Sequence, residues 1–202
     1  YKKLNKITKY INSSKFIYNV KNKDDGRICS LLNEEIVIRK ITTKFPFTYA
    51  STNRRELGDF YIKHYNNHYP VNLKLISKNN KSYNNIVGSP RVMKHLFFED
   101  KKLSISYEGI TKGIINNNFS DKINDYGLLV IQKETGNCDC SSLLKLKKVN
   151  SNPTNGFQFK ELNSIERTPL ESREFIITNF KEVLRKRAHP YLLFEKENKR
   201  KK

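Results

Sequence analysis

Three polar side chains lie at spacings that suit metal-dependent chemistry. Asp59 stands at the start of one apolar run, and Asn72 and Lys74 are separated by a single residue within a second apolar run. Metal-dependent cleavage of a phosphodiester bond needs oxygen ligands that hold a divalent cation. A nearby ammonium group helps because it can lower the pKa of the attacking water and stabilise charge that develops on phosphorus. These residue types could therefore support phosphodiester hydrolysis.

The pattern around these residues predicts a β-hairpin that would bring them together. Residues 58–65 and 70–76 alternate between apolar and polar types on either side of a turn at 65–68. Successive side chains of a strand point to opposite faces of a sheet. Asn72 and Lys74 would therefore share one face, and the apolar residues between them would share the other.

The same spacing has a second interpretation, in which these residues carry no chemistry. The chain is rich in Asn and Lys, so an Asn-x-Lys tripeptide arises by chance, and many strands have one solvated polar face. Asp59 could simply cap a turn after Gly58. The spacing by itself leaves both interpretations open.

The charge of the chain favours a polyanionic partner. The 202 residues include 39 Lys and Arg against 20 Asp and Glu, a net charge of +19. Binding to phosphates releases condensed counterions, which favours nucleic acid as the partner. An AT-rich coding sequence would also raise the Lys and Asn content, but the basic excess is larger than such drift usually leaves. No apolar run reaches the roughly 20 residues that cross a membrane, and no segment pairs a basic face with a broad apolar one.

The cysteines predict a reducing, cytoplasmic compartment. The chain contains Cys29, Cys138 and Cys140, an odd number without a disulfide framework. The Cys-x-Cys pair at 138–140 has no second pair and no His at a zinc-like spacing. We therefore expect a turn that carries two thiols, and no zinc site.

The segments on either side of the hairpin predict two helices and a buried strand. Apolar spacing over 28–41 indicates an amphipathic helix. Ser89 and Pro90 suit a helix start, with Ser as the N-cap and Pro in the first turn. Residues 126–132 form a short continuous apolar run, which is typical of a strand buried on both faces.

The second half predicts one more strand, a loop and a final helix. We expect a strand over 143–149 and a polar loop over 150–156. Thr168 to Glu171 form a capping box, with Pro169 at the first helical position of a helix that runs to about Ala188.

The order of these elements predicts a mixed α/β fold in a single domain. The expected domain covers 1–202, with a basic N-terminal arm or helix over 1–23, a core over 24–190 and a basic C-terminal tail over 191–202.

The hairpin residues resemble the active-site hairpin of the PD-(D/E)XK nucleases, and of type II restriction endonucleases in particular. Asp59 matches the first acid of that motif, and Asn72 and Lys74 match the (D/E)-x-K pair. Residues 24–41 are similar to the N-terminal helix of these enzymes, in which a Glu facing the hairpin often completes the metal site, and Glu34 matches it. The order of the later segments is also similar, so the resemblance runs from about 24 to 188: DYGLLVIQKETG (125–136), NPTNGFQF (152–159) and the helix that begins TPLESREF.

Two positions depart from the family pattern. Asn72 occupies the slot of an acid, and its amide oxygen can bind Mg²⁺ but brings no negative charge. This change implies a lower affinity for the metal or a single ion. Gly58 replaces the Pro of the motif, a position that shapes the backbone before the acid.

The resemblance implies a restriction-endonuclease-like α/β core, a mixed β-sheet with a catalytic hairpin flanked by helices. Asp59 and Asn72 would hold Mg²⁺ with support from Glu34, and Lys74 would position or activate the attacking water. The substrate would be double-stranded DNA, cut at a short specific sequence. A two-fold site would call for a homodimer.

Polar residues just after the hairpin suit contacts with DNA. Such side chains can bind phosphates or base edges, although a solvated loop would have the same composition. The candidates are Asn84, Asn85, Ser89 and Arg91. Two other functions stay open at this point: a basic DNA- or RNA-binding protein without enzymatic activity, and a nuclease of the same superfamily with a role in repair, in mobile elements or in RNA cleavage.

Overall fold

The computed structural model describes residues 2–14, 26–53, 56–77, 84–86 and 88–187. The basic tail expected over 191–202 lies outside these described residues. The chain forms two compact units that interleave along the sequence. The first unit comprises Tyr1–Ser82 and Tyr126–Leu143, and the second comprises Tyr83–Asp125 and Leu144–Lys202. This division describes packing within each unit, so the single domain expected from the sequence stays a prediction.

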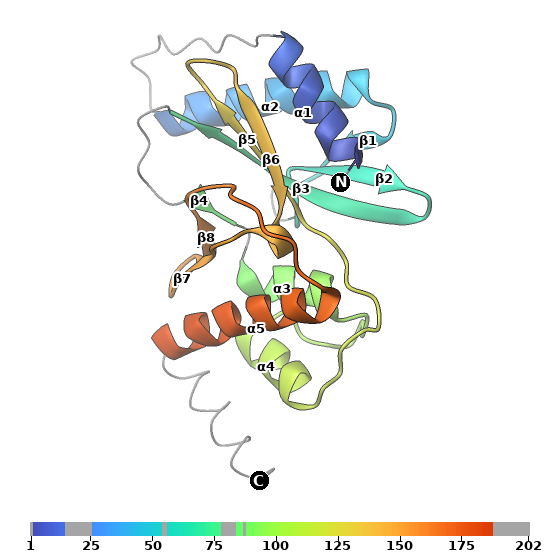
Figure 1. Ribbon diagram of the computed structural model, residues 1–202, viewed down its shortest axis with the longest axis vertical. Helices are drawn as coiled ribbons and strands as arrows, with labels where there is room; N and C mark the ends of the chain where they lie inside the picture. The colour runs from blue at the N-terminus through green and yellow to red at the C-terminus, as the bar shows by residue number, and fades with distance from the viewer. Residues whose placement is uncertain (1, 15–25, 54–55, 78–83, 87, 188–202) are drawn as a thin grey trace. The chain divides into compact units, whose positions relative to one another are not determined.

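The first unit is a mixed five-stranded sheet with two helices (Figure 1). Its elements are α1 (Lys2–Ser14), α2 (Gly26–Lys44), β1 (Thr48–Ala50), β2 (Phe60–His64), β3 (Asn67–Ile76), β5 (Gly127–Gln132) and β6 (Cys138–Ser142). The strand order is β1-β2-β3-β5-β6. The first three strands form an antiparallel meander, β5 runs parallel to β3, and β6 runs antiparallel to β5. The predicted mixed α/β fold is confirmed.

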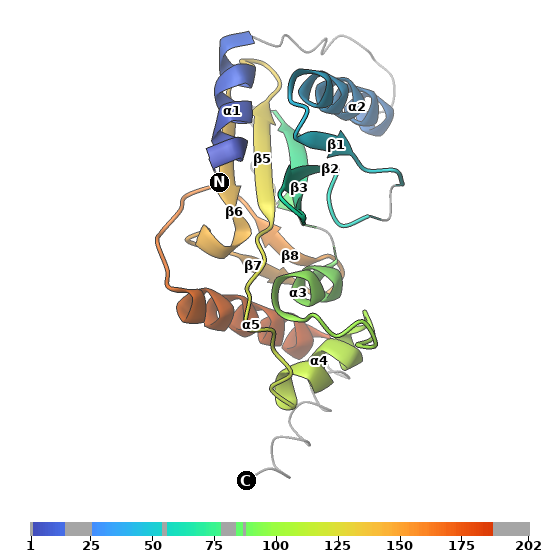
Figure 2. The ribbon, with the colours of Figure 1, turned by 90° about the vertical axis from the view of Figure 1, so that its right-hand side faces the viewer.

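Both helices of the first unit pack on the apolar face of its sheet. Figure 2 shows α1 beside β6 and α2 beside β1, in agreement with their contacts. The spacing of three and four residues between buried positions on each helix gives one apolar stripe per helix. The buried cluster includes Leu4, Ile7 and Ile11 of α1, Val37 and Ile41 of α2, and Val71, Leu73 and Leu75 of β3.

The second unit packs three helices with a small antiparallel sheet. Its elements are β4 (Asn84–Asn85), α3 (Ser89–Phe97), α4 (Tyr107–Ile115), β7 (Asn150–Asn152), β8 (Gly156–Phe159) and α5 (Pro169–Lys186). The strand order is β4-β8-β7. The capping box predicted at the start of α5 is confirmed, since the side chains of Thr168 and Glu171 each accept a hydrogen bond from the other's backbone N–H.

The predicted hairpin is confirmed, with a tighter turn than expected. His64 pairs with Asn67, so the turn consists of Tyr65 and Asn66 alone. Tyr65 supplies the positive φ of 52° that such a two-residue turn requires. Pro70 therefore lies inside β3, where the strand has β2 as its neighbour but does not yet pair with β5.

Two predictions for the region after β5 are wrong. The strand is β6 rather than 143–149, and residues 143–145 form a 3-10 turn instead. The small Cys and Ser side chains of β6 hide the alternation that marks a strand. Cys138 and Cys140 thus lie in a strand and not in a turn, and burial raises the pKa of the Cys138 thiol to about 12.

Two further details differ from expectation in the second unit. The polar loop expected over 150–156 contains β7 and the start of β8, which form a hairpin with Gly156 at a positive φ of 78°. Ser89 is the first residue of α3 and not its cap, because Gly88 holds the N-cap position. Among the described residues, no helix is long and apolar enough to cross a membrane.

Candidate active site

The first unit contains the three predicted metal ligands, Glu34, Asp59 and Asn72, and the predicted catalytic Lys74. Asp59 immediately precedes β2, Asn72 and Lys74 lie in β3, and Glu34 lies in α2. The charges of Asp59, Lys74 and Lys133 all act on the Glu34 carboxyl. The fold therefore brings a helix residue close to the hairpin residues.

Asp59 is held by the backbone on three sides. Its N–H donates to the Val71 carbonyl at 2.9 Å, and its carbonyl accepts from the Ser51 N–H at 3.2 Å. Its Oδ2 accepts from the Leu73 N–H at 2.6 Å, where β2 has not yet begun to pair with β3. The carboxylate is thus bonded next to Asn72, and no described residue donates a hydrogen bond to its Oδ1.

The residues before Asp59 are packed closely against the sheet. A Cβ on Gly58 would lie 2.9 Å from the Pro70 Cβ, closer than real contacts allow, so only Gly lets the chain approach β3 this closely. The Leu57 N–H donates to the Tyr61 hydroxyl at 3.2 Å, and the Tyr126 hydroxyl donates to the Leu57 carbonyl at 3.0 Å. Gly58 thus shapes the backbone, the role expected of this position.

Asn72 is a buried polar residue with an unsatisfied acceptor. It is 3% exposed, and its Oδ1 has no hydrogen-bond partner among the described residues. An unsatisfied buried acceptor costs about 1–3 kcal/mol, so it calls for an explanation. Its neighbour across the parallel register is Leu128, which is also buried. The interpretation of this strand face as solvated is therefore wrong at Asn72.

Glu34 is half-buried on α2 and lies on the helix side that carries Val37 and Ile41. It lies three and seven residues before Val37 and Ile41, both of which are buried in the core. Consecutive helix residues point about 100° apart, and the neighbouring Glu35 is exposed. Of these two neighbouring acids, Glu34 is therefore the more buried.

The two carboxyl groups of the site are poorly solvated. Burial raises the pKa of Glu34, Lys74 lowers it in part, and the charge of Asp59 raises it further. Burial likewise raises the pKa of Asp59, against the lowering effects of Lys74 and of the Leu73 N–H. An additional cation near both groups would favour their charged forms.

The donor set fits a hard cation such as Mg²⁺. Two carboxylates and the unsatisfied amide oxygen of Asn72 are the oxygen ligands that Mg²⁺ prefers, and Mg²⁺ usually keeps waters in its other positions. Within the described ranges, no group of three or more His, Cys, Asp or Glu side chains could hold a metal. Asp59 offers a carboxylate and Asn72 an amide oxygen, and the carboxyl of Glu34 is linked to them through the charges of Asp59 and Lys74 that act on it.

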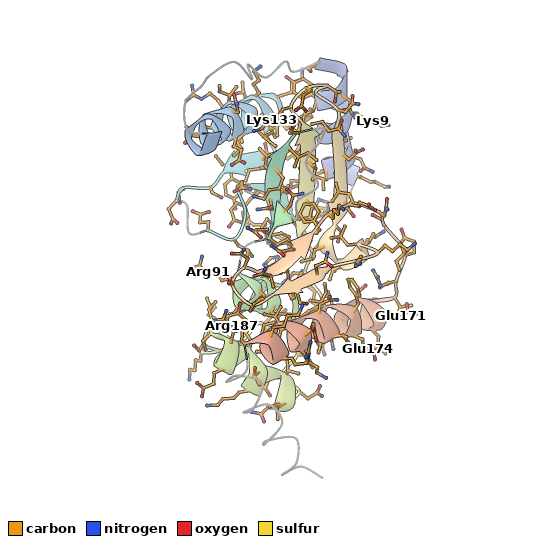
Figure 3. All side chains as sticks on the ribbon, turned by 90° about the vertical axis from the view of Figure 1, so that its left-hand side faces the viewer. Lys9, Arg91, Lys133, Glu171, Glu174 and Arg187 are labelled. Atoms are coloured by element: carbon orange, nitrogen blue, oxygen red, sulfur yellow. The ribbon has the colours of Figure 1, made fainter. Side chains whose placement is uncertain are left out.

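Lys133 is a residue of this site that the sequence did not reveal. It follows β5, its N–H donates to the Ile76 carbonyl at 2.9 Å, and its charge lowers the pKa of Glu34. Figure 3 shows it at the end of the sheet near α2. Only the parallel pairing of β3 with β5 brings it there, and no local signal predicts that pairing.

The four candidate DNA contacts belong to the second unit. Asn84 and Asn85 form β4, and the Asn85 Oδ1 accepts from the Gln158 side chain at 2.5 Å. Arg91 is exposed on α3 (Figure 3). Ser89 is 0% exposed and donates to the Tyr107 hydroxyl at 3.2 Å, which corrects its placement at the surface.

Comparison of the sequence with models of known protein families and with curated proteins gives no match. The fold of the first unit and the geometry around Asn72 are therefore the features that bear on function. The relevant features are an unsatisfied amide oxygen, two poorly solvated carboxyls and a lysine on the same strand face.

Proposed function

We propose that this protein is a Mg²⁺-dependent endonuclease that hydrolyses phosphodiester bonds of double-stranded DNA at a short specific sequence. The observation that carries the proposal is the buried Asn72 Oδ1, which lacks a partner among the described residues and lies next to the anchored Asp59 carboxylate. The class would be the type II restriction endonucleases of the PD-(D/E)XK superfamily. The mixed sheet with its hairpin and flanking helices supports a restriction-endonuclease-like core.

The residues of the first unit would divide the work between metal binding and water activation. Asp59, Glu34 and Asn72 would hold Mg²⁺ through their oxygens. The bound ion would supply Lewis-acid stabilisation of charge on the phosphate and a lower pKa for the attacking water. Asp59 suits this role because its backbone is fixed on both sides and one carboxylate oxygen is already anchored.

Lys74 would act at the reacting phosphate. It lies two residues after Asn72, so both side chains share a strand face. Its ammonium would donate to the attacking water and to a phosphate oxygen, which orients the water for attack on phosphorus. The water oxygen bonds to phosphorus and gives up a proton to solvent, the bond from phosphorus to the leaving oxygen breaks, and the leaving oxygen takes up a proton from solvent.

A homodimer is part of the proposal. Cleavage of both strands at a two-fold symmetric site matches a protein with the same symmetry. Each chain would contribute one set of Glu34, Asp59, Asn72 and Lys74, and each set would cut one strand.

The proposal is tested by cleavage of mixed-sequence plasmid or phage DNA with and without Mg²⁺. The informative variant is Asp59→Asn, because Asn can still accept the hydrogen bond from Leu73 but carries no charge. Asp139→Asn is the matched control, since Asp139 is an exposed acid on β6 of the same unit. We expect discrete fragments from the wild type and the control, and a loss of at least about 100-fold in Asp59→Asn, equivalent to about 2.7 kcal/mol.

Other outcomes would point to the rival functions. DNA binding without cleavage at several divalent metals and pH values would contradict the proposal and indicate a non-enzymatic binding protein. Metal-dependent cleavage without discrete fragments would retain the nuclease but indicate a role in repair or in mobile elements. Preferential cleavage of RNA would exclude DNA as the substrate.

A further inference from the structure

The second unit contains an open pocket whose rim is rich in lysine. Its volume is about 490 Å³. It is formed by the chain on either side of the β7–β8 hairpin. The lining residues are Lys147, Lys148, Asn150, Lys160, Glu161 and Asn163.

The three lysines around the pocket are not neutralised by acids. Within the part of the chain that the structure describes, none of Lys147, Lys148 and Lys160 forms an ion pair, whereas the neighbouring Lys145 pairs with Glu166 at 2.9 Å. The single acid of the lining, Glu161, accepts a hydrogen bond from the Asn163 amide at 2.7 Å. The pocket therefore has a net positive charge, and its lysines are exposed to solvent.

The backbone around the pocket is held in place by hydrogen bonds. The Lys147 N–H donates to the Asn163 carbonyl at 2.6 Å, which joins the two sides. The Arg167 guanidinium donates to the carbonyls of Leu144 and Leu146 at 3.1 and 3.0 Å and stacks 3.9 Å from the centre of the Phe175 ring. The backbone that carries the lysines is therefore already ordered, so less conformational entropy is lost when a ligand binds.

We infer that this pocket binds the phosphate backbone of DNA. Exposed ammonium groups are point charges that suit phosphate oxygens, and the two Asn amides can donate to the same oxygens. The lining has no aromatic ring on which a base could stack. Such contacts position the duplex and carry no sequence information. The pocket would therefore raise the affinity for DNA of any sequence, and the site proposed above would supply the specific cleavage. The choice of DNA as the ligand rests on that proposed function.

The test is the salt dependence of binding to a fluorescently labelled DNA duplex, measured by anisotropy in EDTA so that no cleavage occurs. The pocket variant is Lys147→Gln with Lys160→Gln. The control is Lys101→Gln with Lys102→Gln, which removes the same charge from two exposed lysines elsewhere in the second unit. The slope of log K against log salt changes by about 0.9 for each lost phosphate contact. We expect it to fall by about 2 in the pocket variant and to stay unchanged in the control.

Three results would overturn the inference. Equal weakening in the two variants would show that only net charge matters, and unchanged binding by the pocket variant would place the DNA elsewhere. Tighter binding of an RNA duplex than of the DNA duplex by the wild type would replace DNA with RNA as the ligand.

Wild-type cleavage with Mg²⁺ separates this inference from the proposed function. If the wild type cleaves DNA but the pocket variant binds like the control, only the inference fails. If the wild type never cleaves but the pocket variant alone loses DNA affinity, the proposed function fails and the pocket stands.

Discussion

Lys74 in the first unit and the pocket lysines in the second unit lie in different environments. In the first unit, Lys74 is half-buried and acts on the carboxyls of Glu34 and Asp59. In the second unit, Lys147 and Lys160 are exposed and form no ion pair with the described residues. A cation held among acids suits a reacting centre, whereas exposed, unpaired cations suit the binding of a polyanion. The net charge of +19 counts both kinds alike and so cannot tell them apart.

The variant expected to change DNA cleavage most is Lys74→Ala, and it tests the contrast between the two kinds of lysine directly. We expect DNA cleavage to fall by about 10²–10⁴-fold, because the variant loses the group that orients water and stabilises the phosphate. DNA affinity in EDTA should stay close to that of the wild type, since Lys74 is one half-buried charge among many exposed ones. Single-turnover cleavage and anisotropy binding measure the two quantities on the same DNA.

Lys63→Ala is the matched control for this variant, because Lys63 is an exposed lysine on β2 of the same hairpin. Its cleavage rate should equal that of the wild type. If Lys74→Ala lost affinity and cleavage in equal proportion, Lys74 would be a binding residue like those of the pocket, and the contrast between the two units would break down.

A smaller loss of cleavage is expected for Asn72→Leu. Leu has a similar size and removes the unsatisfied amide, so the metal-free fold should gain about 1–3 kcal/mol, or about 2–4 °C in Tm for each kcal/mol. Cleavage should fall by at least about 10–100-fold, since even the residues that support metal ligands have effects of that size. Thermal unfolding in EDTA measures the gain in stability, and cleavage with Mg²⁺ measures the loss of activity.

Asn72→Asp is the companion variant, because it keeps the oxygen and adds the charge found at this position in the family that the hairpin resembles. It should cleave at lower Mg²⁺ concentrations than the wild type. Full cleavage by Asn72→Leu would show that the amide is not a ligand and would remove the observation on which the proposed function rests.

The local alternation of the sequence was sufficient to predict the hairpin, whereas Glu34 was proposed only from the resemblance to the nuclease family. Alternation with a period of two defines β2 and β3. The apolar spacing over 28–41 predicted the helix α2 but not its buried stripe, since Ile36 is 51% exposed and Val37 is buried. These patterns involve neighbours in the chain, so they require no knowledge of the tertiary fold.

Features that depend on distant segments were not predictable. The burial of Asn72 depends on its pairing with Leu128, and Lys133 reaches the site through the same parallel strand pair. The lysine-lined pocket requires the backbone bond between Lys147 and Asn163. Each of these contacts joins segments whose pairing leaves no periodic signal in either one.

The smallest effect is expected for Glu34→Gln, and it concerns stability. Burial raises the pKa of Glu34 above its ordinary value of 4.5, so the folded state binds the proton more tightly than the unfolded state. As the pH rises through the interval between 4.5 and this raised pKa, stability is lost, and the loss is complete above it. Removal of the charge should therefore raise Tm near neutral pH, and the gain should vanish below pH 4.5.

Glu35→Gln is the control, because this exposed neighbour on α2 should change Tm little at any pH. A change of about 1 kcal/mol would shift Tm by about 2–4 °C in a chain of this size.

Added Mg²⁺ should raise the Tm of the wild type more than that of Glu34→Gln, because the ion stabilises the charged carboxyl that the variant lacks. A lower Tm for Glu34→Gln at neutral pH would show that Lys74 and Lys133 already compensate the buried charge. The carboxyl would then be one half of a structural ion pair. The contrast between a reacting centre in the first unit and a binding surface in the second would be lost.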